Sequence, residues 1–97
     1  MNYDKKYLES EVDRLNRKYA KRSKHKLRVQ GGYNGVQVQI TGKKGKRGYR
    51  GYLGSGCDQI TTGFLSPKET LFKLYQADSQ GDIKRKFKSV DGKKKIR

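Results

Sequence analysis

The spacing of hydrophobic residues changes along this chain of 97 residues, and that change constrains the fold more than any single motif. Leu8, Val12 and Leu15 recur every three to four positions, the period of an amphipathic helix. Hydrophobic and polar residues then alternate between residues 26 and 41, as they do in half-buried strands. The helical period returns after Pro67. This order predicts an α+β fold in which an N-terminal amphipathic helix packs on a small antiparallel sheet that is followed by a second helix.

The first predicted helix has a basic side. At about 100° per residue, the side opposite the hydrophobic stripe carries Lys6, Arg14, Arg17, Lys21 and Lys24. Acidic residues come first along this helix and basic residues later, which suits the helix dipole. We expect Asp13 and Arg17 to form an ion pair, because they are four positions apart.

The central part of the chain is predicted to form the sheet. The alternating segments 27–30 and 36–40 flank a glycine-rich stretch, which predicts a hairpin. Residues 49–53 follow a second glycine-rich connection and are a candidate third strand. Residues 57–62 either extend that strand after a bulge or form a short fourth one, so we expect three to four antiparallel strands.

The second helix has a clear start signal. Ser66 can cap it, Pro67 suits the first helical position, and Glu69 can complete a capping box. Gly81 is a suitable stop. Beyond it, hydrophobic residues recur at helical spacing over 82–90, a pattern that leaves a short third helix undecided. We expect one domain over residues 1–91 and a flexible basic tail over 92–97.

The charge of the chain is strongly unbalanced. Lys and Arg number 25 against 9 Asp and Glu, a formal net charge of +16. Residues 14–28 carry 8 of these cations, residues 43–50 carry 5 and residues 84–97 carry 8, so 21 of the 25 lie in three clusters. A merely solvated surface usually mixes its signs, and the first cluster contains no acid. The clusters therefore predict one extended surface for a polyanion.

The predicted nucleic-acid-binding residues are cations of these clusters together with two tyrosines, whose rings can stack on unpaired bases. They are Arg14, Arg17, Lys21, Lys24, Lys43, Lys44, Lys46, Arg47, Tyr49, Arg50, Tyr52, Lys84, Arg85, Lys86 and Lys88. The basic helix side lacks the Asn and Gln pattern that reads base edges in a major groove. We therefore expect recognition of backbone and shape, with RNA favoured over DNA.

Few residues are available for catalysis or metal binding. With one His and one Cys, the chain can build neither a zinc site nor a thiol redox pair, so we predict no enzyme activity, cofactor, metal or small-molecule substrate. A nucleophile pair of Cys57 and His25 competes with simpler roles as a small buried residue and a loop residue. Gly42–Gly45 matches the GxxG loop of KH domains, but it follows a strand instead of joining two helices.

The expected location is the cytoplasm of a bacterial host. The single Cys cannot form an internal disulfide, and the first residues lack the pattern of a secretory signal peptide. No run approaches the roughly 20 apolar residues of a membrane span, so we expect no membrane partner.

The predicted order of helix, three strands and helix is similar to that of the double-stranded RNA-binding domain. The similarity covers most of residues 3–80 as topology. The basic start of that family's second helix is missing, because residues 66–70 contain one lysine and one glutamate.

Three stretches resemble small accessory proteins of phages and other mobile elements of Gram-positive bacteria. They are YLESEVDRLN at 7–16, GYNGVQV at 32–38 and TGFLSPKETL at 62–71. This group includes anti-CRISPR proteins, which disable RNA-guided nucleases. An inhibitor that imitates DNA must be acidic to occupy the nuclease's cationic channels, and this chain has the opposite sign. The resemblance therefore implies an inhibitor that acts through guide RNA or the assembled ribonucleoprotein.

Three functions remain in competition at this point. The first is a phage or mobile-element accessory protein that binds RNA or a ribonucleoprotein, such as an RNA-guided nuclease. The second is a general RNA- or DNA-binding or ribosome-associated protein. The third is a protein-interaction module that binds an acidic partner.

Overall fold

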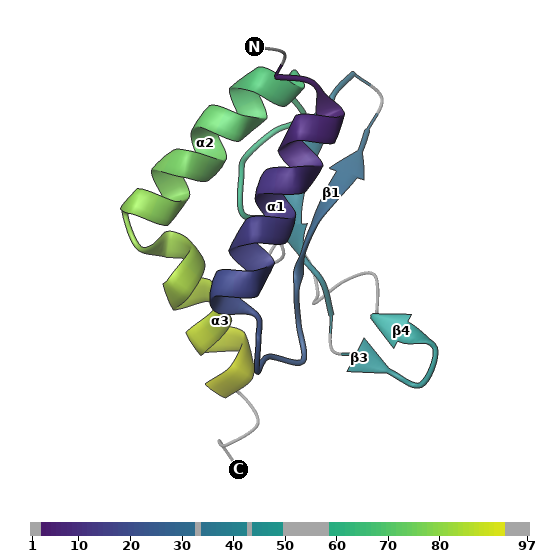
Figure 1. Ribbon diagram of the computed structural model, residues 1–97, viewed down its shortest axis with the longest axis vertical. Coiled ribbons are helices and arrows are strands. Elements are labelled where there is room, and N and C mark those ends of the chain that lie inside the picture. The colour runs from purple at the N-terminus through teal and green to yellow at the C-terminus, as the bar shows by residue number, and fades with distance from the viewer. Residues whose placement is uncertain (1–2, 33, 43, 50–58, 93–97) are drawn as a thin grey trace.

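A computed structural model of the chain describes residues 3–32, 34–42, 44–49 and 59–92 (Figure 1). The elements in order are α1 (Lys5–Tyr19), β1 (Leu27–Gly31), β2 (Val36–Ile40), β3 (Lys44–Gly45), β4 (Gly48–Tyr49), α2 (Pro67–Ser79) and α3 (Asp82–Gly92). The predicted α+β class and its leading helix are confirmed.

Helix α1 begins after Asp4, whose Oδ1 accepts a hydrogen bond from the Tyr7 amide at 2.9 Å. Its predicted hydrophobic stripe is confirmed, since Leu8, Val12 and Leu15 are all buried. The helix ends at Tyr19, because residues 21–26 supply no hydrophobic side chain to continue the stripe.

Two details of the predicted basic helix side are wrong. Lys21 and Lys24 lie in the connection after α1, not on the helix. Among the described residues, Arg17 and Asp13 form no ion pair; Arg14 instead pairs with Glu11 at 3.2 Å.

Strands β1 and β2 form the predicted antiparallel hairpin. Leu27 lies opposite Ile40 and Gly31 lies opposite Val36. The turn is closed by the Gly32 amide, which donates to the Gly35 carbonyl at 2.8 Å.

The prediction of a third strand in the same sheet is wrong for the part that the structure describes. Strand β4 pairs with β3 in a separate two-stranded hairpin, with Lys44 opposite Tyr49. The remainder of the predicted strand, residues 50–53, lies outside the described residues. The free edge of β2 is instead bordered by the segment 59–65, which forms single bridges from Gln59 to Gln39 and from Leu65 to Val36.

The segment 59–65 borders β2 without becoming a strand because its backbone does not keep a regular register. The amides of Ile60 and Thr61 both donate to the Val38 carbonyl, at 2.9 and 3.2 Å. The Thr61 hydroxyl accepts from the Val38 amide at 3.1 Å, a place that a strand carbonyl would otherwise take. Gly63 then turns the chain with a φ of 72°. Of the undecided segment 57–62, the first two residues lie outside the described part and the rest make isolated contacts.

Helices α2 and α3 follow the sequence signals closely. Ser66 caps α2, with its Oγ accepting from the Glu69 amide at 3.3 Å and donating to Glu69 Oε1 at 2.9 Å. Gly81 separates the two helices with a φ of 81°, which a residue with a side chain rarely adopts. The undecided third helix does form and reaches Gly92, and its hydrophobic face is buried. Residues 93–97 of the predicted tail lie outside the described part.

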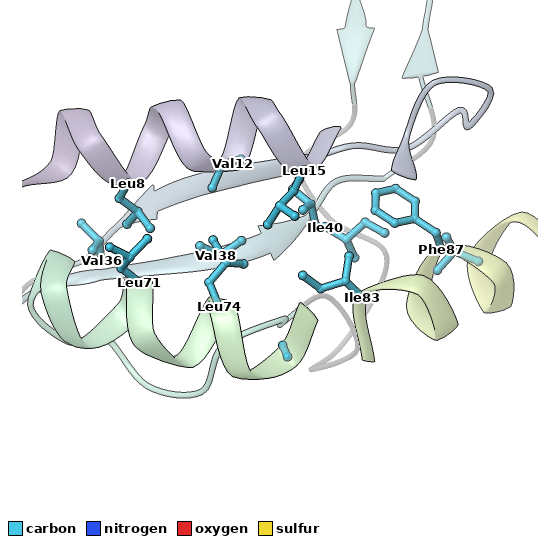
Figure 2. Close-up of a cluster of buried hydrophobic side chains, with 13 residues drawn as sticks. Leu8, Val12, Leu15, Val36, Val38, Ile40, Leu71, Leu74, Ile83 and Phe87 are labelled. Carbon is cyan, nitrogen blue, oxygen red and sulfur yellow. The ribbon is translucent and has the colours of Figure 1, made fainter. Parts of the chain in front are cut away.

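The core lies where the three helices meet one face of the β1–β2 hairpin (Figure 2). Val36, Val38 and Ile40 of β2 face α1 and α2, while α3 contributes Ile83 and Phe87. A hydrogen bond joins the start of α2 to β2: the Thr70 hydroxyl donates to the Val36 carbonyl at 2.9 Å.

Two tyrosines connect α1 to α2 through hydrogen bonds. The Tyr75 hydroxyl donates to Glu11 Oε1 at 2.8 Å, and the Tyr19 hydroxyl donates to Asp78 Oδ1 at 2.5 Å. Burial, followed by hydrogen bonding to Glu11 and Tyr7, raises the pKa of Tyr75 above its ordinary value. Tyr75 therefore remains a neutral hydrogen-bond donor in this helix interface.

Candidate nucleic-acid interface

The connection between α1 and β1, residues 20–26, links segments that are distant in sequence. The Lys24 carbonyl accepts a hydrogen bond from the Lys44 amide at 2.7 Å. Ser23 Oγ donates to Asp91 Oδ1 of α3 at 2.9 Å. The connection, the β3–β4 hairpin and the end of α3 thus lie at one end of the molecule, the lower end in Figure 1.

The connection is held in place by local hydrogen bonds. Ser23 Oγ accepts from the His25 amide at 3.0 Å, and the Lys26 amide donates to Thr41 Oγ1 at 3.1 Å. His25 is buried, and its Nδ1 lies 3.0 Å from the Thr41 carbonyl oxygen. Because a carbonyl only accepts, Nδ1 carries the hydrogen. His25 therefore anchors the connection to the end of β2; Cys57, its suggested catalytic partner, lies outside the described residues.

The connection and the hairpin both expose cations. Lys21, Arg22 and Lys24 are exposed on the connection. The hairpin exposes Lys44, Lys46 and Arg47. The hydrogen bond between Lys24 and Lys44 places these two groups side by side, so the first and second sequence clusters form one surface.

Helix α3 adds the third cluster on its side nearest the connection. Lys84, Lys88 and Asp91 occupy positions i, i+4 and i+7, which share one side of a helix. Since Asp91 accepts the hydrogen bond from Ser23, the two exposed lysines lie on the side of the helix that faces the connection.

The other predicted residues have more varied positions. Arg17 is exposed in the last turn of α1, and Tyr49 ends β4. Arg85 forms an ion pair with Asp82, and Lys86 is half-buried beside Gln59 at a separate groove. Arg14 is neutralised by its ion pair with Glu11. Lys43, Arg50 and Tyr52 lie outside the described residues.

Arg22 is an exposed cation of this end that the helical projection does not predict. It belongs to the basic run 14–28, but the projection places it on the side of the hydrophobic stripe. The α1 helix ends before Arg22, so the helical projection does not apply to it, and its side chain is exposed next to Lys21. The continuous run of cations includes Arg22, whereas the helical projection leaves it out.

Acidic residues near this end are already bonded within the protein. Asp78 accepts from Tyr19, Asp82 pairs with Arg85, and Asp91 accepts from Ser23. Asp78 and Asp82 are held by Tyr19 and Arg85, whereas Asp91 is held at the connection itself by Ser23. The exposed lysines and arginines outnumber these three carboxylates, so this end of the molecule has an excess of positive charge.

Two further properties concern the part of the chain that the structure describes. It contains no group of three or more His, Cys, Asp and Glu side chains placed to hold a metal ion. It also contains no helix long and apolar enough to cross a bilayer.

Comparison with protein-family models, curated proteins and solved structures finds no match to this chain.

Proposed function

We propose that the protein is a non-enzymatic accessory protein that binds RNA, or an RNA-containing complex, through one basic end. The basic end comprises Arg17, Lys21, Arg22, Lys24, Lys44, Lys46, Arg47, Lys84 and Lys88. The observation that carries the proposal is the pair of hydrogen bonds from Lys44 to Lys24 and from Ser23 to Asp91, which gathers three separate sequence clusters.

The arrangement favours contacts with the phosphate backbone. The cations come from a connection, a short hairpin and one side of a helix, so no single helix presents a row of base-reading side chains. Such a mixed surface suits shape recognition, which is the dominant mode for structured RNA. If about six phosphates are neutralised, log affinity should fall against log salt with a slope of roughly −4 to −5.

The proposed biological setting is a phage or mobile element, and the proposed target is an RNA-guided nuclease. This part rests on the sequence resemblance together with the sign of the charge. A protein of net charge +16 is repelled by the cationic channels that hold nucleic acid in such nucleases, but it is attracted to exposed guide RNA.

A matched pair of triple variants tests the binding surface. One variant carries Lys21→Ala, Arg22→Ala and Lys24→Ala at the basic end. The control carries Lys5→Ala, Lys6→Ala and Lys68→Ala, which removes the same charge from exposed positions at the starts of α1 and α2. Fluorescence anisotropy with a guide RNA, an unrelated RNA duplex and a DNA duplex, each over a salt series, measures affinity and salt slope.

The basic-end variant should lose about two to three units of salt slope, because three phosphate contacts are removed. The control should keep nearly the wild-type slope. Equal losses in both variants would show that total charge, and not this surface, governs binding. A wild-type protein that fails to retain any of the three nucleic acids at low salt would overturn the proposal entirely.

Inhibition of a reconstituted RNA-guided nuclease separates the accessory protein from a general RNA binder. The wild-type protein should slow cleavage, whereas the basic-end variant should lose this effect. RNA binding without inhibition would leave the general RNA-binding function as the better description.

A further inference from the structure

The outer edge of β1 carries backbone groups that point away from β2. The hydrogen bonds from Gly32 to Gly35 and from Thr41 to Lys26 identify two hydrogen-bonded pairs of the β1–β2 ladder, one at each end of the hairpin. By the alternation of an antiparallel ladder, Leu27, Val29 and Gly31 direct their amides and carbonyls toward the opposite edge.

At Leu27 this edge is closed by a side chain of α1. The Leu27 amide donates to Asn16 Oδ1 at 2.7 Å, and Asn16 Nδ2 donates to the Leu27 carbonyl at 3.0 Å. The carboxamide therefore makes the two bonds that a neighbouring strand would make. At Val29, neither the amide nor the carbonyl has such a partner among the described residues.

The open edge borders a groove of 340 Å³ between α1 and β1. Its helix wall carries Glu9, Val12 and Asp13 next to Asn16, and its strand wall runs from Lys26 to Val29.

The two carboxylates on the helix wall, those of Glu9 and Asp13, differ from the other described acidic residues in having no bonded partner. Among the acidic residues that the structure describes, those with a hydrogen bond or ion pair are Asp4, Glu11, Glu69, Asp78, Asp82 and Asp91. Glu9 and Asp13 have no such partner in that part of the chain, and both are exposed. In a chain of net charge +16, these are two carboxylates that no described ion pair neutralises.

The spacing of these carboxylates matches that of an extended chain. Side chains at i and i+4 of a helix lie about 6 Å apart. Alternate side chains on one side of a strand lie roughly 6.7 Å apart, twice the rise per residue. Two alternate residues of a strand placed in the groove would therefore meet Glu9 and Asp13 in turn.

Two cations, Lys26 and Arg28, also line the strand wall of the groove. Both belong to the side of the hairpin opposite Leu27 and Val29, and Arg28 Nη2 donates to Gln39 Oε1 on β2 at 3.4 Å. Among the described residues, neither cation forms an ion pair with Glu9 or Asp13, so both carboxylates stay available to a ligand.

We propose that an extended segment of a partner protein, with Lys or Arg at alternate positions, adds as a strand to β1 in this groove. The added segment pairs with the Val29 amide and carbonyl, as in other cases of strand addition to a sheet edge. Its basic side chains face Glu9 and Asp13. This interaction uses a surface different from the basic end and does not depend on RNA binding.

A short synthetic peptide that alternates Lys and Val serves as the probe, and a peptide with Glu in place of Lys is its control. In an antiparallel pair, residues directly opposite place their side chains on the same side of the sheet. The Lys residues, which face α1, must therefore be the ones that bond to β1. N-methylation of the Lys amides should abolish binding, whereas N-methylation of the Val amides should change affinity by less than about twofold.

The readout is the NMR spectrum of the whole protein during peptide titration to about 2 mM at about 150 mM salt. We expect shifts centred on Val29 and the facing side of α1, slower hydrogen exchange at the Val29 amide, and clearly weaker binding of the Glu peptide. Shifts that map to another surface, no binding at the highest concentration, or equal losses from both N-methylated peptides would overturn the proposal.

Protein variants test the role of the carboxylates. Glu9→Gln with Asp13→Asn should lower affinity for the Lys peptide about fivefold, as expected for two exposed ion pairs. Ser79→Lys with Ser89→Lys adds the same two charges at exposed positions of α2 and α3 outside the groove and should have little effect. The basic-end triple variant should bind the peptide as wild type does, which distinguishes this proposal from the RNA-binding one.

Discussion

Replacement of Asn16 by Ala tests whether one side chain holds α1 to the edge of the hairpin. Asn16→Ala removes both hydrogen bonds to Leu27, a residue that is only 1% exposed. The two bonds are worth about 1 to 3 kcal/mol together, at roughly 0.5 to 1.5 kcal/mol each. Ala is a better helix former than Asn by about 0.6 kcal/mol, which offsets part of this loss. The expected fall in the free energy of unfolding is therefore about 1.5 kcal/mol.

Urea denaturation followed by circular dichroism measures this difference. With an m-value near 1 kcal/mol/M, the unfolding midpoint should fall by about 1.5 M. Arg17→Ala is the control, because Arg17 is the next residue of the same helix, exposed and without a described ion pair. The control should change stability by less than about 0.5 kcal/mol.

A second substitution at the same position should make the free energy of unfolding depend on pH. The carboxyl of Asn16→Asp can still accept from the Leu27 amide, but when ionised it cannot donate to the Leu27 carbonyl. The folded state should raise the pKa of this carboxyl above its unfolded value of about 3.9. The folded protein then holds a proton that the unfolded chain has lost, so the variant should become less stable as pH rises from about 4. An Asn16→Ala protein as stable as wild type, together with a pH-independent Asn16→Asp, would refute the role given to Asn16.

Three further predictions concern the core, a close backbone approach and the helix interface. Leu71→Ala should cost about 2 to 4 kcal/mol in denaturant unfolding, because Leu71 is fully buried in the core. Gly35→Ala should cost about 1 to 3 kcal/mol, since the new Cβ would overlap the Leu65 carbonyl oxygen; retention of wild-type stability would contradict this contact. Burial and hydrogen bonding to Glu11 raise the pKa of Tyr75, so the folded state keeps a proton that the unfolded chain loses above about pH 10. The free energy of unfolding should then fall by up to about 1.4 kcal/mol per pH unit in that range, and Tyr75→Phe should lack this component.

The local elements were predictable because their signals are short-range. The helical stripe of α1, the alternation that forms β1 and β2, and the Ser66 cap of α2 each depend on neighbours within a few residues. These are the features that propensity and periodicity describe, since one turn of helix or one pair of strand residues establishes them.

The sequence predictions were wrong where distant parts of the chain compete for the same backbone groups or side chains. The place beside β2 is taken by the segment 59–65, because the Thr61 hydroxyl and the amides of Ile60 and Thr61 satisfy Val38. No local pattern around residue 49 could show that this edge was already occupied. Glu11 Oε1, which pairs with Arg14, likewise accepts a hydrogen bond from Tyr75 on another helix; nothing in the structure explains why Asp13 and Arg17 do not pair.

Composition and local order were sufficient to establish a small α+β protein with an excess of cations in three separate runs. Where those runs lie relative to one another is a property of the folded chain, because it depends on hydrogen bonds between residues up to 68 positions apart, as between Ser23 and Asp91. The open edge of β1 is likewise a property of the folded chain. Its position follows from the pairing of β1 with β2, and the two hydrogen bonds between Asn16 and Leu27 close it at Leu27 but not at Val29. Those two bonds form only when the helix packs on the hairpin.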